Sequence, residues 1–134
     1  MVDFMVEVET GRDIRVLQLT DPQILAAEDE RYPTRVGDEW AYKEEQKHER
    51  YVEQVIREYN PDFIIVTSDV VYGEFDDNGE HLLRYIIFMD SFKIPWAPVF
   101  GNHDQESNMW ADWQCEQLEK SEYCLFKQRS HGEF

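Results

Sequence analysis

The sequence is poor in cysteine and in long apolar runs, and each shortage excludes a class of protein. Two cysteines, Cys115 and Cys124, occur in 134 residues. Without a paired CxxC motif they exclude a zinc ribbon and argue against a disulfide framework. No run approaches the roughly 18 apolar residues of a membrane span, and the N-terminus lacks the features of a signal peptide. We therefore expect two reduced, partly buried thiols in a cytoplasmic chain.

Basic residues are also scarce, because 13 Lys and Arg face 29 Asp and Glu and give a net charge of −16. This balance argues against binding to nucleic acid or to an anionic membrane through a basic face. It favours divalent cations wherever carboxylates converge. The hydrophobic share of 42% is typical of a globular protein, and the length predicts a single domain over residues 1–134.

Strand and helix patterns take turns along the chain, which predicts an α/β fold with a mainly parallel sheet flanked by helices. Apolar runs predict strands at 14–19, 62–67 and 96–100, with a fourth strand expected at 123–127. The continuous run at 62–67 is typical of a central strand covered on both faces. Helical periodicity predicts helices at 39–59, from 78 to about 89, and from about 108 to 120.

The predicted helices also have expected caps and buried faces. Asp38 is the expected N-cap of the first helix, and Asn60-Pro61 ends it. The apolar periodicity places one set of side chains on a single stripe of the first helix and another set on the buried side of the second. The first set is Tyr51, Val52, Val55, Ile56 and Tyr59; the second is Leu82, Leu83, Ile86, Ile87 and Met89.

Each of the three predicted strands is followed by a polar residue that can bind a metal ion. These residues are Asp21, Asp69 and Asn102. Because ligands bind at the carboxyl ends of the strands in open α/β sheets, we expect the three side chains to converge. Hard oxygen ligands suit Mg, Mn, Fe or Zn, and an aspartate can bridge two ions held about 3.5–4 Å apart.

The motifs at these strand ends are Asp21-Pro22-Gln23, Ser68-Asp69 and Gly101-Asn102-His103-Asp104. In order and spacing they resemble the D-x-H, GD and GNHD motifs of the calcineurin-like metallophosphoesterase family. The stretch IPWAPVFGNHDQES is similar to the purple-acid-phosphatase-related branch of that family, and the resemblance covers residues 14–128. It implies the N-terminal half of a metallophosphoesterase α/β sandwich and hydrolysis of phosphate esters by a metal-activated hydroxide at a two-metal site.

The same resemblance implies a role for each motif residue. Asp21 and Gln23 would bind the first metal ion, Asp69 would bridge the two ions, and Asn102 would bind the second. The two ions would be divalent or trivalent Mn, Fe, Zn or Mg. His103 would donate a proton to the leaving oxygen or stabilise its charge, and Asp104 would orient that histidine.

Two motif positions depart from the family pattern. Gln23 stands where many relatives have histidine, and an amide is a weaker metal ligand than an imidazole. Ser68 stands where glycine is usual. If glycine is preferred there for a positive φ or a close approach to the metals, the serine crowds the site; otherwise the serine is simply tolerated.

Histidines are few, and none of the four forms the family's later histidine motifs. His48 and His81 lie in predicted helices and are expected to pack or face solvent, while His131 is expected in a disordered tail. Because the family's catalytic domain is longer, the resemblance implies an N-terminal fragment. Such a fragment would expose a sheet face and a strand edge, which favours self-association unless a missing C-terminal half covers them.

Two interpretations of function therefore stay open. One is a metal-dependent phosphoesterase acting on a phosphate ester; the other is a catalytically incomplete fragment or a non-catalytic metal-binding or interaction domain with the same fold. A phospho-acceptor receiver domain is disfavoured, because Thr20-Asp21 offers one carboxylate where a receiver needs a pair. The sequence names neither the substrate nor the metal.

Overall fold

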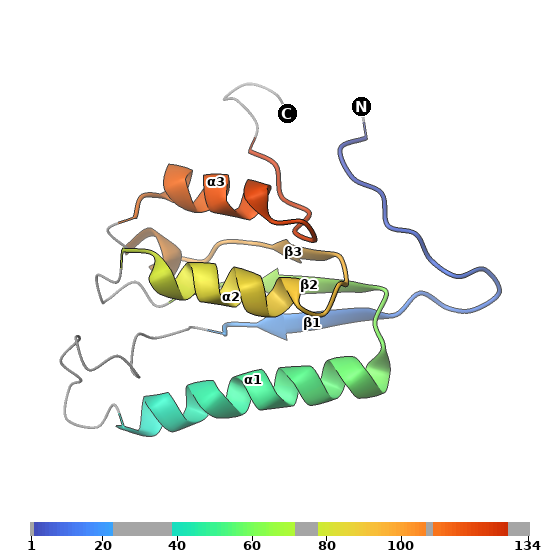
Figure 1. Ribbon diagram of the computed structural model, residues 1–134, viewed down its shortest axis with the longest axis horizontal. Coiled ribbons are helices and arrows are strands. Elements are labelled where there is room, and N and C mark those ends of the chain that lie inside the picture. The colour runs from blue at the N-terminus through green and yellow to red at the C-terminus, as the bar shows by residue number, and fades with distance from the viewer. Residues whose placement is uncertain (1, 23–38, 72–77, 107–108, 129–134) are drawn as a thin grey trace.

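The computed structural model describes residues 2–22, 39–71, 78–106 and 109–128. Figure 1 shows a sheet with helices packed against it. In chain order the elements are β1 (Val16–Thr20), α1 (Glu39–Tyr59), β2 (Phe63–Thr67), α2 (Glu80–Asp90), β3 (Trp96–Pro98), the 3₁₀ helix η1 (His103–Glu106) and α3 (Ala111–Lys120). The expected N-cap Asp38 and the tail residue His131 lie outside the described residues.

The three strands form one parallel sheet in the order β1-β2-β3. The β1–β2 register runs from Val16 opposite Phe63 to Thr20 opposite Thr67, and β2 pairs with β3 from Ile64 opposite Trp96. This arrangement confirms the predicted α/β fold class. The expected fourth strand is reduced to one parallel bridge between Trp96 and Cys124.

The core lies on one face of the sheet. Parallel neighbours joined by right-handed crossovers place successive helices on the same face, and a single buried cluster joins side chains of the sheet with side chains of all three helices. It includes Ile64, Val66 and Trp96 from the strands, Val52 and Ile56 from α1, Leu82, Tyr85 and Met89 from α2, and Leu118 from α3.

The second face of the sheet is much less covered. Burial alternates along β2, so that Ile64 and Val66 are fully buried while Phe63, Ile65 and Thr67 are half-buried. The prediction that this strand is covered on both faces is therefore wrong for one face. A continuous apolar run does not separate the two cases, because nothing within the run itself reports which face is packed.

The buried faces of the helices are narrower than the apolar patterns predicted. In α1, Val52 and Ile56 are buried, whereas Tyr51, Val55 and Tyr59 are 40–62% exposed. In α2, Leu82, Ile86 and Met89 are buried as expected, and His81 and Tyr85 join them. Leu83 and Ile87 are 38% and 69% exposed, so their predicted burial is wrong.

Residues in the left-handed region mark two helix boundaries. Asn60 (φ 49°) follows α1 and its N–H donates to the carbonyl of Ile56 at 2.9 Å, which ends the helix at the predicted place. Gly79 (φ 77°) precedes α2, and a Cβ there would lie 2.2 Å from the ring of Trp113. Glycine at this position therefore permits both the turn and the packing of α3 on α2.

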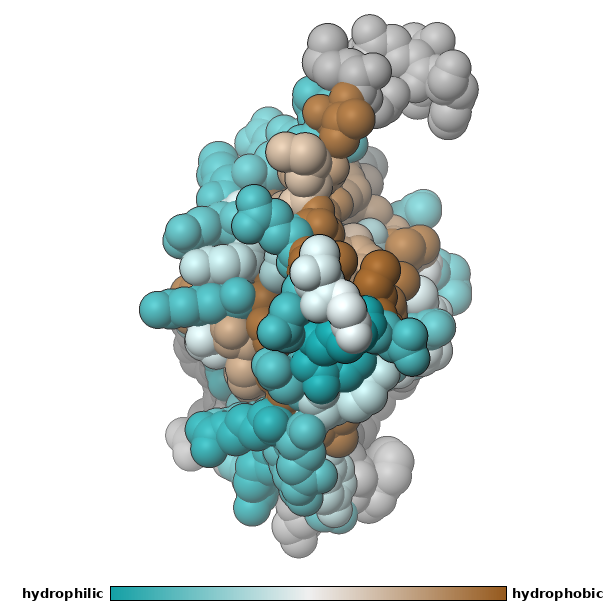
Figure 2. Space-filling model, turned by 90° about the vertical axis from the view of Figure 1, so that its right-hand side faces the viewer, coloured by the Kyte–Doolittle hydropathy of each residue, from teal (hydrophilic) through white to brown (hydrophobic). Residues whose placement is uncertain are grey.

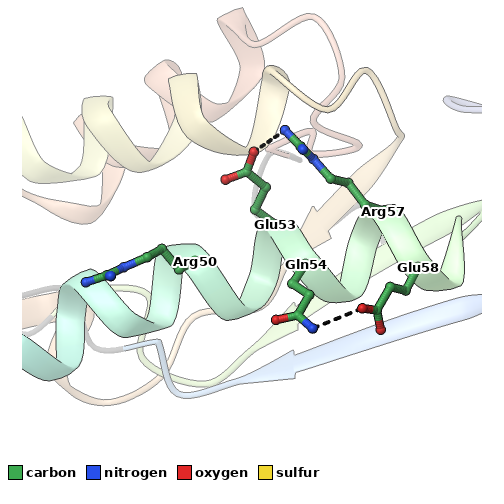
Figure 3. A pocket seen from close by; sticks show the side chains of 5 residues that line it. All are labelled: Arg50, Glu53, Gln54, Arg57 and Glu58. Atoms are coloured by element: carbon green, nitrogen blue, oxygen red, sulfur yellow. Dashed lines mark hydrogen bonds and ion pairs between the residues drawn. The ribbon is translucent and has the colours of Figure 1, made fainter.

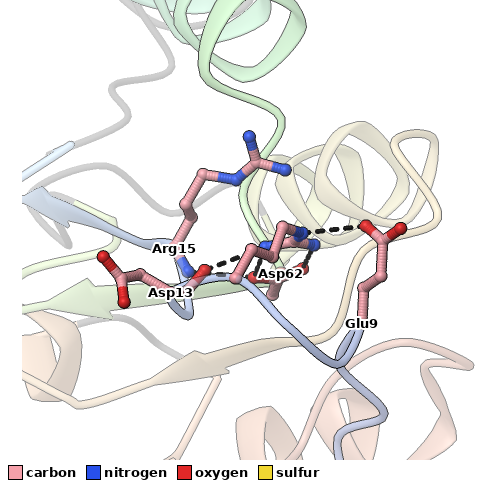
Figure 4. A network of polar contacts seen from close by, with 5 residues as sticks. Glu9, Asp13, Arg15 and Asp62 are labelled. Atoms are coloured by element: carbon pink, nitrogen blue, oxygen red, sulfur yellow. Dashed lines mark hydrogen bonds and ion pairs between the residues drawn. The ribbon is translucent and has the colours of Figure 1, made fainter.

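A polar network anchors the amino end of β1 (Figure 4). The Arg12 guanidinium donates two hydrogen bonds to the carboxylate of Asp62, at 2.5 and 2.8 Å, and the backbone N–H of Arg15 donates to the same carboxylate at 2.9 Å. These donors lower the pKa of Asp62 below its usual range. The network holds the start of β1 beside the start of β2, at the end of the sheet opposite the strands' carboxyl ends.

Hydrophobic side chains reach the surface on the side that carries the amino ends of the strands (Figure 2). The N-terminal segment and β1 contribute exposed apolar residues, among them Val2 at 76%, Met5 at 83%, Ile14 at 62% and Val16 at 44%. Among the helices within the described ranges, none is both long and apolar enough to cross a membrane. Cys115 and Cys124 are buried free thiols, which confirms the sequence prediction.

The adjacent residues Ile86 and Ile87 allow a matched test of this packing, because their exposed fractions are 7% and 69%. We expect Ile86→Ala to lower the free energy of unfolding by about 2–4 kcal/mol through the lost burial and the cavity. Ile87→Ala on the solvent side should change it by less than about 0.5 kcal/mol. Urea denaturation of both variants measures the difference, and equal losses would contradict the orientation of α2.

Candidate functional site

The predicted ligands at the strand ends share one edge of the sheet. The backbone N–H of Asp21 donates to the carbonyl of Thr67 at 3.0 Å, so the residue after β1 lies beside the end of β2. On the other side of β2, the N–H of Val99 donates to the carbonyl of Val66 at 2.8 Å. Asp21, Asp69 and Asn102 therefore follow three neighbouring strands at their carboxyl ends, where the parallel topology was expected to bring them.

Asp69 contacts the turn that follows β3. Its carboxylate accepts a hydrogen bond from the backbone N–H of His103 at 2.8 Å, and its side chain is nearly inaccessible to solvent. A Cβ built on Gly101 would lie 2.0 Å from Asp69 Oδ1 and 2.5 Å from its backbone nitrogen. Only a glycine allows this approach, which explains the first residue of the Gly101-Asn102-His103-Asp104 turn.

Asp104 points into the protein and binds backbone groups from two strand ends. One carboxylate oxygen accepts the N–H groups of Val70 and Val71 at 3.0 and 2.9 Å, and the other accepts the N–H of Gly101 at 2.8 Å. Burial raises the pKa of the Asp104 carboxyl above its usual value, against the lowering effect of these N–H donors. Asp104 therefore holds the turn after β3 against the residues that follow β2.

His103 has a different acidic partner from the one predicted. Its Nδ1 lies 2.8 Å from Oε2 of Glu106, while the Asp104 carboxylate is bonded to backbone N–H groups. The hydrogen bond to Glu106 raises the pKa of His103, and the negative charge of Asp69 acts in the same direction. A catalytic role for Asp104 stays a prediction, but the contact expected to orient His103 is made by Glu106.

Gln114 of α3 binds the backbone that follows the Gly101-Asn102-His103-Asp104 turn. Its buried side-chain amide donates to the carbonyl oxygens of Asp104 and Met109, at 2.7 and 2.8 Å. Sequence reasoning missed both Gln114 and Glu106. The three-residue spacing from His103 was a usable signal for Glu106, because side chains at i and i+3 overlap on a 3₁₀ helix. No sequence pattern marked Gln114.

Two residues at the strand ends have a backbone conformation that is unusual for their type. Asp21 has φ 51° and Ser68 has φ 65°, both in the left-handed region that favours glycine. Ser68 thus has the positive φ that was considered as one reason for a glycine at this position. Whether the serine crowds the site stays a prediction. Strained residues of this kind cluster at functional sites.

The donor atoms at the sheet edge are hard oxygen ligands, which fits the metals that the motifs imply. The carboxylates of Asp21 and Asp69 and the amide of Asn102 are of this type. Within the described ranges, no group of three or more His, Cys, Asp or Glu side chains is arranged to hold a metal ion. Gln23 lies outside the described residues, so its predicted part in the site stays a prediction.

Two further histidines belong to the helical layer. His81 is 3% exposed in the first turn of α2. His48 is half-buried in α1, with its ring 6.4 Å from that of Tyr85 and its pKa lowered by burial. Of the two alternatives considered for these histidines, packing is the one that the structure shows.

A hollow of about 300 Å³ on α1 is a separate feature (Figure 3). It is lined by Arg50, Glu53, Gln54, Arg57 and Glu58, all from one helix, and the pairs Glu53–Arg57 and Gln54–Glu58 bond each other. This half of α1 leads to the amino end of β2, so the hollow lies at the end of the sheet opposite the strand-end residues.

Comparison with known proteins settles the family. The model of the family described as calcineurin-like phosphoesterase matches residues 14–131. The chain belongs to the calcineurin-like phosphoesterase family. This confirms the resemblance found in the sequence motifs.

Curated relatives are matched over a part of their length. The phosphatase DCR2 of Saccharomyces cerevisiae is 31% identical over 131 residues, which is 93% of this chain and 22% of the relative. The probable inactive purple acid phosphatase 28 of Arabidopsis thaliana is 31% identical over 96 residues, 71% of this chain and 24% of the relative. The chain thus spans less than a quarter of the length of these relatives. No solved structure matches it.

The left-handed conformation of Ser68 predicts that Ser68→Gly stabilises the protein. We expect the free energy of unfolding to rise by about 0.5–1 kcal/mol, because glycine relieves the strain at a modest cost in chain entropy. The control is Ser91→Gly, where φ is −60° and the hydroxyl donates to the Phe88 carbonyl at 2.6 Å. That variant should lose stability in urea denaturation; a loss in Ser68→Gly as well would contradict the strain.

The three N–H donors around Asp104 predict a large effect of an isosteric change. In Asp104→Asn, the amide nitrogen replaces an acceptor oxygen and faces a backbone N–H. We expect the free energy of unfolding to fall by about 1–3 kcal/mol, because buried donors are left without an acceptor. Glu116→Gln on the exposed surface of α3 is the charge-matched control. Equal denaturation midpoints for the two variants would show that the Asp104 contacts contribute little.

Proposed function

We propose that this chain is part of a metal-dependent phosphoesterase and carries the first half of a two-metal site. The supporting observation is the position of Asp69. Asp69 follows β2, the strand between β1 and β3, and its buried carboxylate contacts the Gly101-Asn102-His103 turn, which packs on it at the distance only glycine allows. Asp21 follows β1 beside the end of β2. A carboxylate in this central position is the natural bridge between two cations.

The remaining ligands follow from the same edge. Asp21, with Gln23, would hold one ion and Asn102 the other, both through oxygen atoms. Bound ions would supply positive charge that polarises the phosphoryl group and activates water. The identity of the ions as Mn, Fe, Zn or Mg is carried by the family resemblance alone.

His103 is the proposed proton donor of the reaction. Its backbone N–H donates to the carboxylate of Asp69, and its Nδ1 lies within hydrogen-bonding distance of Glu106, at 2.8 Å in each case. Acidic side chains therefore contact both its main chain and its ring. The raised pKa means that the imidazole stays protonated to a higher pH than an ordinary histidine does. Proton transfer from this ring to the leaving oxygen is the step that the residues of this chain would carry out.

The proposal assigns half of a site to this chain for two reasons. The family's later histidine motifs are absent from the sequence, and the match to the yeast phosphatase covers 22% of that relative. We expect the missing ligands and the substrate contacts to come from residues outside this sequence. The phosphate-ester substrate, self-association and a cytoplasmic location stay predictions.

A second candidate is a domain that keeps the fold without turnover. Plant relatives matched by this chain are described as probable inactive purple acid phosphatases. Such a protein would hold an ion or a partner at the same edge. Metal binding and hydrolysis therefore have to be measured separately.

Metal binding by the chain itself tests the proposed ligands. We expect Mn²⁺, measured by the paramagnetic resonance of the free ion, to bind the 134-residue chain, and Asp69→Asn to weaken the Kd at least about tenfold because one negative charge is removed. The asparagine keeps an acceptor for the His103 N–H, so the turn is preserved. Glu116→Gln should bind as the parent does. Equal affinity of Asp69→Asn and the control would overturn the role of Asp69.

Hydrolysis of para-nitrophenyl phosphate with Mn²⁺ or Fe then separates the two candidates. We expect little turnover from this chain alone and clear turnover from a longer form that includes the later histidine motifs. Robust turnover by the 134-residue chain that is abolished by His103→Ala would contradict the half-site. Absence of turnover in the longer form would favour the non-catalytic candidate.

A further inference from the structure

Glu106 is an acidic residue in contact with the His103 ring, and no motif of the family assigns it a role. Both residues belong to η1, a helix of three residues per turn, which places the side chain at i+3 directly over the one at i. Oε2 of Glu106 lies 2.8 Å from Nδ1 of His103, within the range of a charge-assisted hydrogen bond. The pair is therefore built into the local backbone.

The other two carboxylates near His103 are committed to the main chain. Asp69 accepts the backbone N–H of His103, and Asp104 accepts those of Val70, Val71 and Gly101. These contacts fix where the backbone of the turn lies, but they leave rotation of the imidazole about its side-chain bonds unrestrained. A contact to a ring atom is needed for that, and Glu106 makes one.

We propose that Glu106 is the positioning residue of His103: by accepting a hydrogen bond from Nδ1–H it sets the orientation and the tautomer of the ring, so that proton exchange with the substrate takes place at Nε2. A carboxylate bonded to one imidazole nitrogen selects the tautomer that carries the proton on that nitrogen. The identity of the proton acceptor rests on the proposed phosphoesterase function, whereas the positioning itself does not.

In the reaction, each proton and electron pair then has a defined destination. An attacking water forms the new bond to phosphorus, and the bond from phosphorus to the leaving oxygen breaks with its electron pair on that oxygen. The leaving oxygen takes the proton from Nε2 of His103, which becomes neutral and keeps Nδ1–H on Glu106. The attacking water loses one proton to solvent, and solvent restores the proton on Nε2.

The tautomer of His103 tests the positioning without any need for hydrolysis. In two-bond nitrogen–proton NMR spectra at about pH 9, where an imidazole is mostly neutral, we expect His103 in the chain to carry its proton on Nδ1. Free histidine favours Nε2 instead. The signals are assigned by their absence in His103→Gln. Glu106→Ala should return the ring to the Nε2–H form, and Glu106→Gln, which keeps an acceptor oxygen, should retain a majority of Nδ1–H.

Glu116→Gln is the matched control, because it removes one exposed acidic charge from the neighbouring α3 and should leave the His103 spectrum unchanged. An Nε2–H tautomer in the parent chain, or an unchanged tautomer in Glu106→Ala, would overturn the proposal. Since Glu106 is exposed, its variants should unfold at the same denaturant concentration as the control.

A kinetic readout then links the position to the reaction. In the form of the protein that hydrolyses para-nitrophenyl phosphate, Glu106→Ala should lower kcat at least tenfold for an alkyl phosphate, whose leaving oxygen needs a proton, and much less for the aryl phosphate, whose leaving group departs as an anion. KM should change little for either. Equal losses on both substrates would contradict positioning of a proton donor. If no form hydrolyses either ester, the proposed function fails while the tautomer still decides the role of Glu106.

Discussion

Two buried carboxylates, Asp69 and Asp104, hold the turn after β3 against the end of β2. Together they accept four backbone N–H groups, those of Val70, Val71 and Gly101 on Asp104 and that of His103 on Asp69. Two negative charges that are both buried repel each other, and the negative charge of Asp69 is one reason that the pKa of Asp104 is raised. The N–H dipoles offset this repulsion, so the turn and the two carboxylates stabilise one another. Without them, neither Asn102 nor His103 would have a fixed place relative to β2.

The four residues of the turn fall into two that stabilise its structure and two that face outward. Gly101 allows contact with Asp69 because it has no side chain, and Asp104 uses its side chain inside the protein. Asn102 and His103, between them, are left to face outward, and Asn102 is exposed while His103 is partly so. In the tetrapeptide the two outer residues therefore build the turn, and the two inner ones are presented at the sheet edge, where they are the proposed oxygen ligand and the proposed proton donor.

The fold could be predicted where local pattern decides it. The bounds of α1, the three strands and the position of the GNHD turn follow from periodicity, from Asn60-Pro61, and from apolar runs that end in polar residues. The exposure of Leu83 and Ile87 could not be predicted, because an apolar residue at the border of a helical stripe is buried only if a neighbouring element reaches it. The same holds for the site. The placement of Asp21, Asp69 and Asn102 at one edge of the sheet follows from parallel topology, but the direction of the Asp104 side chain depends on N–H groups that follow another strand.

Two residues in the left-handed region differ in what their side chains contribute at the sheet edge. β1 and β2 are each followed by a residue with positive φ, Asp21 and Ser68, and glycine would adopt that conformation at less cost. At Asp21 a glycine would remove the carboxylate that we propose as a metal ligand. Ser68 presents no such ligand, and the next residue, Asp69, supplies the carboxylate instead. The strain at Asp21 therefore accompanies a proposed ligand, whereas the strain at Ser68 has no compensating contact in the described structure, and glycine is expected to relieve it.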